Sequence, residues 1–231
     1  MVRAVTGLAM VAALIGSPVA LAEPSCTSDA IVVFDGSASM AEPGPGSTGE
    51  PRIIPAREAM HRAMPGIALS RRLGLVIYGP GNQRKSCDNV DLRFPPIPDA
   101  APRITGAVDA LLPDGNTPLT KAVRSAAEAL EYTSRPGVVV LVTDGRETCG
   151  GSPCALGAEL AATAADMTVH VIGFQMQPDQ DGHPSLRPDN SVHKADCLAK
   201  KTGGQVVTTE TVEELVDALR ETLVCPMVSM K

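Results

Sequence analysis

The sequence is poor in aromatic residues and has no basic stretch, and both shortages limit its possible functions. Only 2% of the 231 residues are aromatic and none is Trp, so the core has to be built from Val, Leu, Ile, Ala and Met. Base stacking needs aromatic platforms, and phosphate binding needs clustered Lys and Arg. With a net charge of −6, the chain is not expected to bind nucleic acid.

Sequence patterns of several enzyme classes are also missing. There is no GxxxxGK[ST] loop to hold phosphates. Residues 36–40, GSASM, lack the last glycine of the GxSxG turn of serine hydrolases. The four histidines have no spacing typical of metal ligands, and His170 falls within a predicted strand, where a packing role is expected. We therefore assign no catalytic residue.

Beyond the N-terminus, no segment approaches the roughly 20 apolar residues of a membrane span. Residues 4–15 form a shorter apolar run behind Arg3, and the sequence ALA at residues 20–22 fits a small-x-small cleavage site. We therefore expect a signal peptide at residues 1–22. The rest, residues 23–231, is expected to be one exported domain, periplasmic or secreted, that does not insert into a membrane.

The six cysteines favour disulfides over metal thiolates, because an exported chain folds in an oxidising compartment. Cys26 does not fit a lipidation site, since the preceding Glu-Pro-Ser lacks small and apolar residues. Cys149 and Cys154 are close enough to form a local disulfide. We prefer this to a zinc pair, because no second cysteine pair with suitable spacing is present. The residues alone leave the remaining pairings open.

The order of apolar segments predicts a single α/β domain. Short β-branched runs alternate with helical patterns, which is typical of a mainly parallel sheet with helices on both faces. No shift in composition marks a second domain. The predicted strands are residues 30–34, 73–78, 90–94, 137–143, 168–174 and 205–209. The predicted helices are residues 56–64, 104–112, 118–132, 154–165, 192–201 and 212–223.

Two details refine this open, doubly wound fold. Residues 90–94 alternate apolar and polar side chains, as an edge strand does, and follow Tyr78 too closely for a parallel crossover, which needs about a dozen residues. That strand is therefore predicted to be antiparallel. Thr211, with Glu214 three positions later, predicts a capping box. The Pro/Gly-rich residues 41–51 and 177–190 predict long surface loops.

Oxygen-bearing side chains follow two predicted strands and precede a helix. Asp35, Ser37 and Ser39 come directly after the first strand, Asp144 follows the strand at 137–143, and Thr117 precedes the helix at 118–132. Ligands of open α/β sheets bind beyond the carboxyl ends of the strands. Two carboxylates and three hydroxyls form a hard oxygen shell that suits Mg²⁺, Mn²⁺ or Ca²⁺. A divalent cation also removes the repulsion between the carboxylates.

Each of these residues also has a structural explanation. Thr117 with Pro118 fits an N-cap and first helical position. The serines fit a turn, and the aspartates fit loop amides. A structural explanation is enough for any single residue. Because all five lie in the right order at the predicted strand ends, we favour the metal site.

Here the sequence resembles the von Willebrand factor A family, which includes integrin inserted domains, and its metal-ion-dependent adhesion site. The family motif is DxSxS after the first strand, a Thr in a central loop and an Asp after the fourth strand. The five residues above match it, and the resemblance covers residues 28–223. The phrases TDGRETCGGSPC and HVIGF are similar to a bacterial secreted branch of the family. The fold implied is Rossmann-like.

The resemblance implies a metal-dependent protein-binding module, not an enzyme. Ser37, Ser39 and sometimes Thr117 are expected to touch Mg²⁺, Mn²⁺ or Ca²⁺ directly, while Asp35 and Asp144 act partly through water. An acidic side chain of a protein partner is expected to fill the open coordination position. The two long loops would set the choice of partner.

The family fold also implies that the two ends of the domain meet at the face opposite the metal, so that Cys26 pairs with Cys225. This bond would close a loop of about 200 residues and contribute at most roughly 5 kcal/mol. It would also restrict movement of the last helix. Cys87 and Cys197 then remain to pair by elimination.

Two other functions remain open. A haloacid dehalogenase-like phosphatase also places an Asp and Mg²⁺ after the first strand, but its DxDxT pattern needs a second Asp where this chain has Ser37. A purely structural domain without metal is the other alternative.

Overall fold

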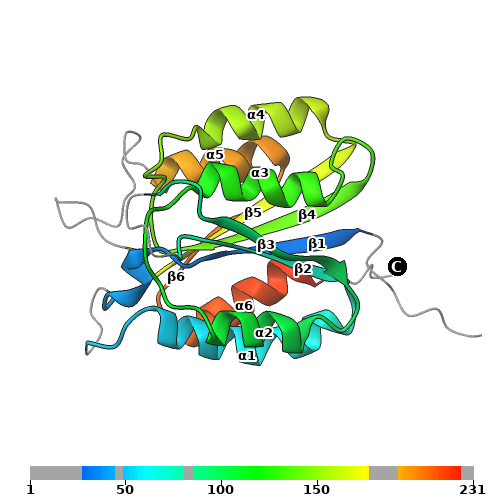
Figure 1. Cartoon of the computed structure of the whole chain (residues 1–231). Helices are drawn as coiled ribbons and strands as arrows, with labels where there is room; N and C mark the ends of the chain where they lie inside the picture. Colours follow the sequence, from blue (N-terminus) through cyan, green and yellow to red (C-terminus); the bar gives the residue numbers. More distant parts are fainter. Residues whose placement is uncertain (1–27, 45–48, 81–85, 177–191, 225–231) are drawn as a thin grey trace, which may run out of the picture.

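The computed structural model describes residues 28–44, 49–80, 86–176 and 192–224, which form one sheet between two helical layers (Figure 1). No helix in these ranges is long and apolar enough to cross a membrane. The strands are β1 (Asp29–Asp35), β2 (Leu73–Tyr78), β3 (Val90–Ile97), β4 (Pro136–Thr143), β5 (Asp166–Phe174) and β6 (Val206–Thr209). The helices are η1 (Ala38–Ala41), α1 (Ile53–Ala68), α2 (Ala101–Asp109), α3 (Leu119–Ala129), α4 (Pro153–Thr163), α5 (Val192–Thr202) and α6 (Val212–Leu223).

The sheet has the strand order β3-β2-β1-β4-β5-β6. Only β3 is antiparallel to its neighbour, and the other pairs are parallel. The predicted fold class and the antiparallel edge strand are therefore confirmed. The chain winds outward from β1 in both directions, so strand order reverses between β1 and β4. Phe34 pairs with Val142, which brings the ends of these two strands side by side at the place where ligands bind in such sheets.

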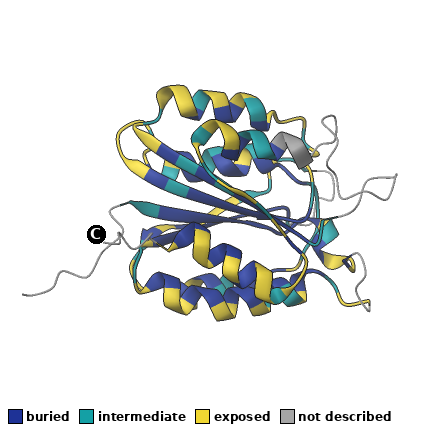
Figure 2. Ribbon diagram, turned by 180° about the vertical axis from the view of Figure 1, so that it is seen from behind, coloured by how far each residue is buried: buried dark blue, intermediate teal, exposed yellow. Residues whose placement is uncertain are grey.

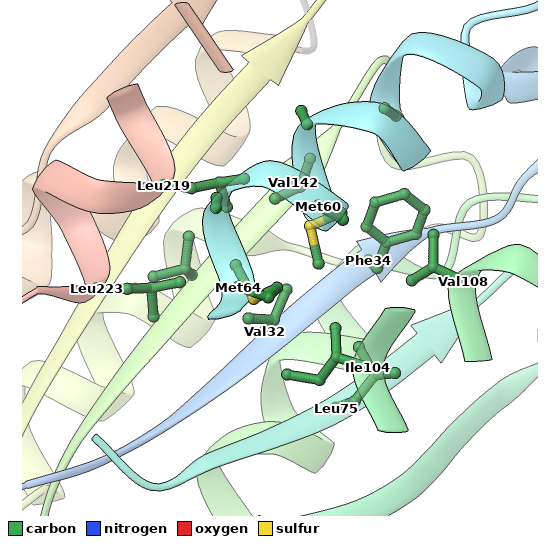
Figure 3. Packing of buried hydrophobic residues seen from close by; sticks show 14 of the residues in the cluster. Val32, Phe34, Met60, Met64, Leu75, Ile104, Val108, Val142, Leu219 and Leu223 are labelled. Atoms are coloured by element: carbon green, nitrogen blue, oxygen red, sulfur yellow. The ribbon is translucent and has the colours of Figure 1, made fainter. Parts of the chain in front are cut away.

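Each face of the sheet has its own apolar core. Helices α1, α2 and α6 cover one face and α3, α4 and α5 the other (Figure 1), and the sides of the helices that face the sheet are coloured as buried (Figure 2). On the first face, Met60 and Met64 of α1 pack over Val32 and Phe34 of β1 (Figure 3). Flexible methionines fill irregular space in this core. The low aromatic content of the sequence predicts such a role for them.

The boundaries of some elements differ from the prediction. Helix α2 begins at Ala101 instead of residue 104, with Pro102 in its first turn, where the missing N–H of proline breaks no helical bond. Strand β3 continues to Ile97, because an edge strand tolerates proline. The capping box of Thr211 and Glu214 at the start of α6 is confirmed.

The disulfides are not those predicted. Cys87 is bonded to Cys149 and Cys154 to Cys197, with Cα–Cα distances of 5.5 Å and 4.8 Å. The predicted pairs Cys149–Cys154 and Cys87–Cys197 are therefore wrong.

The physical reason is that Cys149 and Cys154, although close in sequence, lie in elements that pack against different parts of the protein. Cys149 lies in the loop after β4, whereas Cys154 lies in the first turn of α4. Helix α4 packs tightly on α5, since a Cβ added at Gly157 would come within 2.9 Å of the carbonyl oxygen of Cys197. The predicted pair Cys26–Cys225, the signal peptide at 1–22 and the loop at 177–190 lie outside the described residues.

Candidate metal site at the carboxyl edge of the sheet

The structure brings four of the five predicted site residues into direct contact. The Ser37 and Ser39 hydroxyl oxygens lie 3.1 Å apart, and the Ser39 hydroxyl donates to Asp144 Oδ1 at 2.8 Å. The Ser37 N–H donates to Asp35 Oδ1 at 2.8 Å. Asp35, Ser37 and Asp144 are all buried. The loop after β1 and the loop after β4 thus meet through their polar side chains.

Thr117 comes to the same edge through its loop. The Ala38 N–H donates to the Gly115 carbonyl at 3.1 Å, and the Asp114 N–H donates to the Gly36 carbonyl at 3.0 Å. Thr117 is buried, with 5% of its surface exposed. Its backbone is therefore fixed beside the segment that carries both serines.

The N-cap explanation of Thr117 is wrong. Helix α3 begins at Leu119, one residue later than expected, and Pro118 occupies the N-cap position. The side chain of Pro118 makes no capping hydrogen bond. Instead, Glu147 Oε2 accepts a hydrogen bond from the Thr120 N–H at 2.8 Å. A carboxylate from the loop after β4 therefore binds one of the free backbone N–H groups in the first turn of α3. The Thr117 hydroxyl is thereby not needed as a cap.

The carboxylate of Asp35 is held from both neighbouring strands. Its Oδ2 accepts from the Tyr78 hydroxyl of β2 and the Thr143 hydroxyl of β4, each at 2.7 Å. Burial, and then the charge of Asp35, raise the pKa of Tyr78 well above its usual value, so this phenol remains a donor. Tyr78 and Thr143 were not among the predicted site residues. The available signal was their position as the last residues of two predicted strands beside the first.

Asp144 is held less completely than Asp35. Its Oδ2 is buried, and no donor within the described ranges makes a hydrogen bond to it. Burial, and then repulsion from Asp35, raise the pKa of Asp144 to about 8. A second carboxylate at this edge is therefore costly to ionise, and a cation near its open oxygen would offset that cost.

A buried arginine, which the sequence analysis also missed, lies next to Asp144. Arg52 directly precedes α1 and has none of its surface exposed. Its Nε donates to the Gln175 carbonyl at 2.8 Å, and its Nη1 donates to the Ser39 carbonyl at 2.9 Å. The distance from Nη1 to Asp144 Oδ2 is 3.6 Å. No sequence pattern distinguishes this arginine from surface arginines.

The segment Glu147-Thr148-Cys149 fastens the loop after β4 to the Thr117 loop. The Thr117 N–H donates to the Thr148 hydroxyl at 2.8 Å, and the Thr148 N–H donates to the Thr117 carbonyl at 3.1 Å. Directly after them, Cys149 is bonded to Cys87 in the β2–β3 connection. These contacts give the segment a positioning role that its sequence did not reveal.

The donors at this edge are nearly all oxygens of Asp, Ser and Thr. Within the ranges that the structure covers, no three His, Cys, Asp or Glu side chains come together as a metal-binding group. A cation here would therefore depend on two carboxylates together with hydroxyls. Such oxygen ligands suit a hard cation, whereas structural zinc is bound by Cys and His side chains.

Residues 30–147 match the model of the von Willebrand factor type A domain. Because this match spans more than half of the chain, the protein belongs to the von Willebrand factor type A family. It is 28% identical over 212 residues to the uncharacterized protein YwmD of Bacillus subtilis, covering 88% of each chain. A shorter match, 31% identical over 111 residues, covers 47% of this chain and 43% of the uncharacterized protein YwmC of the same organism.

Solved structures share the fold at low sequence identity. BatB from Bacteroides thetaiotaomicron is 15% identical with a TM-score of 0.58, covering 84% of this chain and 98% of BatB. The pilus adhesin SpaC from Lactobacillus rhamnosus GG is 15% identical with a TM-score of 0.58, over 84% and 29% of the two chains. Proximal thread matrix protein 1 from the mussel byssus, with a zinc-occupied MIDAS motif, is 18% identical with a TM-score of 0.55, over 86% and 48%.

Proposed function

We propose that the protein is an exported module that binds a protein partner through a divalent cation, and is not an enzyme. The cation would be held by Asp35, Ser37, Ser39, Thr117 and Asp144. The observation that carries the proposal is the open Oδ2 of Asp144, which is buried beside a second carboxylate and lacks a hydrogen-bond donor among the described residues. A buried carboxylate oxygen without a donor is costly, and a cation would remove that cost.

The chain's own residues prepare the site for a hard cation. Tyr78 and Thr143 fix the orientation of Asp35, and Ser39 fixes that of Asp144. When bound, Mg²⁺, Mn²⁺ or Ca²⁺ would supply positive charge and a coordination position for an acidic side chain of the partner. Ser37 and Ser39 would contribute neutral oxygens, which leave more of the cation's charge available to that acid.

Three further observations support the proposal. One structural neighbour is a pilus adhesin and another has a zinc-occupied MIDAS motif. Two disulfides in the described part of the chain fit an oxidising compartment. The N-terminal pattern at residues 1–22 fits a signal peptide.

The alternative functions make different use of the same edge. A structural domain without metal is favoured by Arg52, which already lies 3.6 Å from Asp144 and offsets part of its charge. A phosphatase of the DxDxT type is disfavoured, because Ser37 cannot act as the general acid or base.

Calorimetric titration of the purified protein with MgCl₂ and MnCl₂ tests the proposal. We expect one cation to bind per chain, and binding to be lost in Asp35→Ala. Asp109→Ala is the matched control. Asp109 is exposed at the end of α2 and pairs with His61 of α1, so its removal should leave metal binding intact. If the wild-type protein shows no heat and no thermal stabilisation by either cation, the domain is structural. Turnover of p-nitrophenyl phosphate with Mg²⁺ would support the phosphatase instead.

A further inference from the structure

We propose that Arg52 is a built-in counter-charge that weakens binding of the cation alone and makes it depend on a carboxylate bound at the same time. This inference rests on the proposed function, because it concerns the same site. It assigns to Arg52 the role of a charge-setting residue in addition to its contacts with the surrounding loops.

The position of Arg52 puts a permanent charge beside the site. The side chains of Arg52 and Asp144 are both completely buried, and Arg52 Nη1 lies 3.6 Å from Asp144 Oδ2. An arginine side chain does not lose its proton in proteins. Because water is excluded from this pair, the charge of Arg52 acts on the site with little screening.

The contacts of Arg52 are not those of an optimised structural ion pair. Arg–carboxylate pairs that stabilise folds are often bidentate, with two parallel hydrogen bonds. Here Nε and Nη1 are used on the carbonyls of Gln175, Ser39 and Glu42. Both Arg52 Nη2 and Asp144 Oδ2 are buried without a hydrogen-bond partner in the described part of the protein. The guanidinium therefore approaches Asp144 but makes no hydrogen bond to its Oδ2.

The charge count then decides what the site prefers. With a divalent cation bound and both Asp35 and Asp144 ionised, Arg52 brings the total charge of the site to about +1. A buried net charge is unfavourable, and one carboxylate from a partner would bring the total to zero. Without Arg52 the cation alone would neutralise the two aspartates. Arg52 thus makes the cation and the carboxylate bind cooperatively, each strengthening the other by the same factor.

Two substitutions separate the charge of Arg52 from its contacts. Arg52→Lys and Arg52→Met both remove the guanidinium fork that bonds the three carbonyls, but only Arg52→Lys keeps a positive charge. The measurement is the Mn²⁺ affinity by calorimetry at constant ionic strength, in sodium acetate and in sodium chloride, corrected for Mn²⁺–acetate pairing in solution. Acetate serves as the carboxylate probe.

We expect acetate to tighten Mn²⁺ binding in the wild-type protein and in Arg52→Lys, and to have no such effect in Arg52→Met. In chloride, Arg52→Met should bind Mn²⁺ about tenfold or more tightly than Arg52→Lys, because a unit charge a few ångströms away in a poorly screened site has at least this effect. Circular dichroism of the metal-free variants checks their fold, and Arg52→Gln replaces Arg52→Met if that variant does not fold.

A purely structural Arg52 predicts another outcome. Both variants would then lose Mn²⁺ affinity to the same extent, and acetate would tighten Mn²⁺ binding in Arg52→Met as much as in the wild-type protein. Either result overturns the inference while the proposed function stands. If wild-type protein binds no Mn²⁺ in either salt, the proposed function itself fails, so the two failures are distinguishable.

Discussion

The two sides of the candidate metal site are held by different kinds of interaction. On the side of β4 and α3, the Thr117 N–H donates to the Thr148 hydroxyl and the Thr148 N–H donates to the Thr117 carbonyl, and the Cys87–Cys149 disulfide follows directly. On the side of β1 and β5, the buried guanidinium of Arg52 joins the loop after β1 to Gln175 at the end of β5. One side is thus fixed by bonds that carry no net charge, and the other by a residue that also sets the charge of the site.

The difference shows that rigidity and charge can be changed separately at this edge. A disulfide carries no net charge, so its loss should loosen the loop that it holds without altering the electric field at Asp144. Loss of Arg52 should do both.

Replacement of Arg52 by alanine should lower the free energy of unfolding of the metal-free protein by about 3–5 kcal/mol. Removal of one partner of a buried ion pair leaves the other partner uncompensated, and three carbonyls also lose a donor. Urea denaturation in EDTA measures the change. Arg62→Ala is the control, because the ion pairs of Arg62 with Glu58 and Glu213 are exposed and their loss should hardly change the midpoint. Equal effects of the two substitutions would contradict a buried anchor.

The two disulfides should differ in function more than in stability. They close loops with sequence separations of 62 and 43, so removal of either pair should cost about 4 kcal/mol at most in the chain-entropy model. Only the double variant Cys87→Ala/Cys149→Ala should also lower Mn²⁺ affinity, because Thr148 precedes Cys149 and holds Thr117. Calorimetry on this variant and on Cys154→Ala/Cys197→Ala makes the comparison. A loss of affinity in the second variant alone would reverse the assignment.

The contribution of Asp144 to the stability of the metal-free protein should fall as the pH rises from about 4 to about 8. In the folded state the pKa of Asp144 is raised from 3.8 to about 8, so in this window the unfolded chain has lost a proton that the folded chain keeps, and unfolding becomes more favourable with rising pH. Asp144→Asn should remove this slope and stabilise the metal-free protein at pH 8 by about 1 kcal/mol or more. Urea denaturation in EDTA across the pH range tests it, and parallel curves for the two proteins would refute the cause.

Local patterns were sufficient to predict the sheet and the segments at its edge. The β-branched runs around Val32, Val76 and Val140 indicate strands buried on both faces, and the short connection before Val90 leaves room only for an antiparallel strand. Because side chains after parallel strands gather at one edge, the contact between Ser39 and Asp144 could be anticipated. The ligand role of Thr117 stays a prediction, although its alternative role as a helix cap is excluded by the start of α3.

The predictions failed where the outcome depended on which loops meet in space. Cys149 and Cys154 are close in sequence, yet each bonds to a cysteine from a distant segment because a loop and a helix carry them in different directions. Arg52 has a side chain that is usually exposed, and its burial follows from the way α1 begins against the ends of β1 and β5.

The sequence by itself determined the class of fold, the edge at which ligands can bind and the oxygen-rich residues placed there, because hydrophobic periodicity and chain order are local properties. The tertiary structure alone decided the disulfide pairs, the support of Asp35 by Tyr78 and Thr143, and the charge that Arg52 adds beside Asp144. Each of these depends on contacts between segments far apart in the chain, and such contacts form only when the strands pair and the helices pack on the sheet.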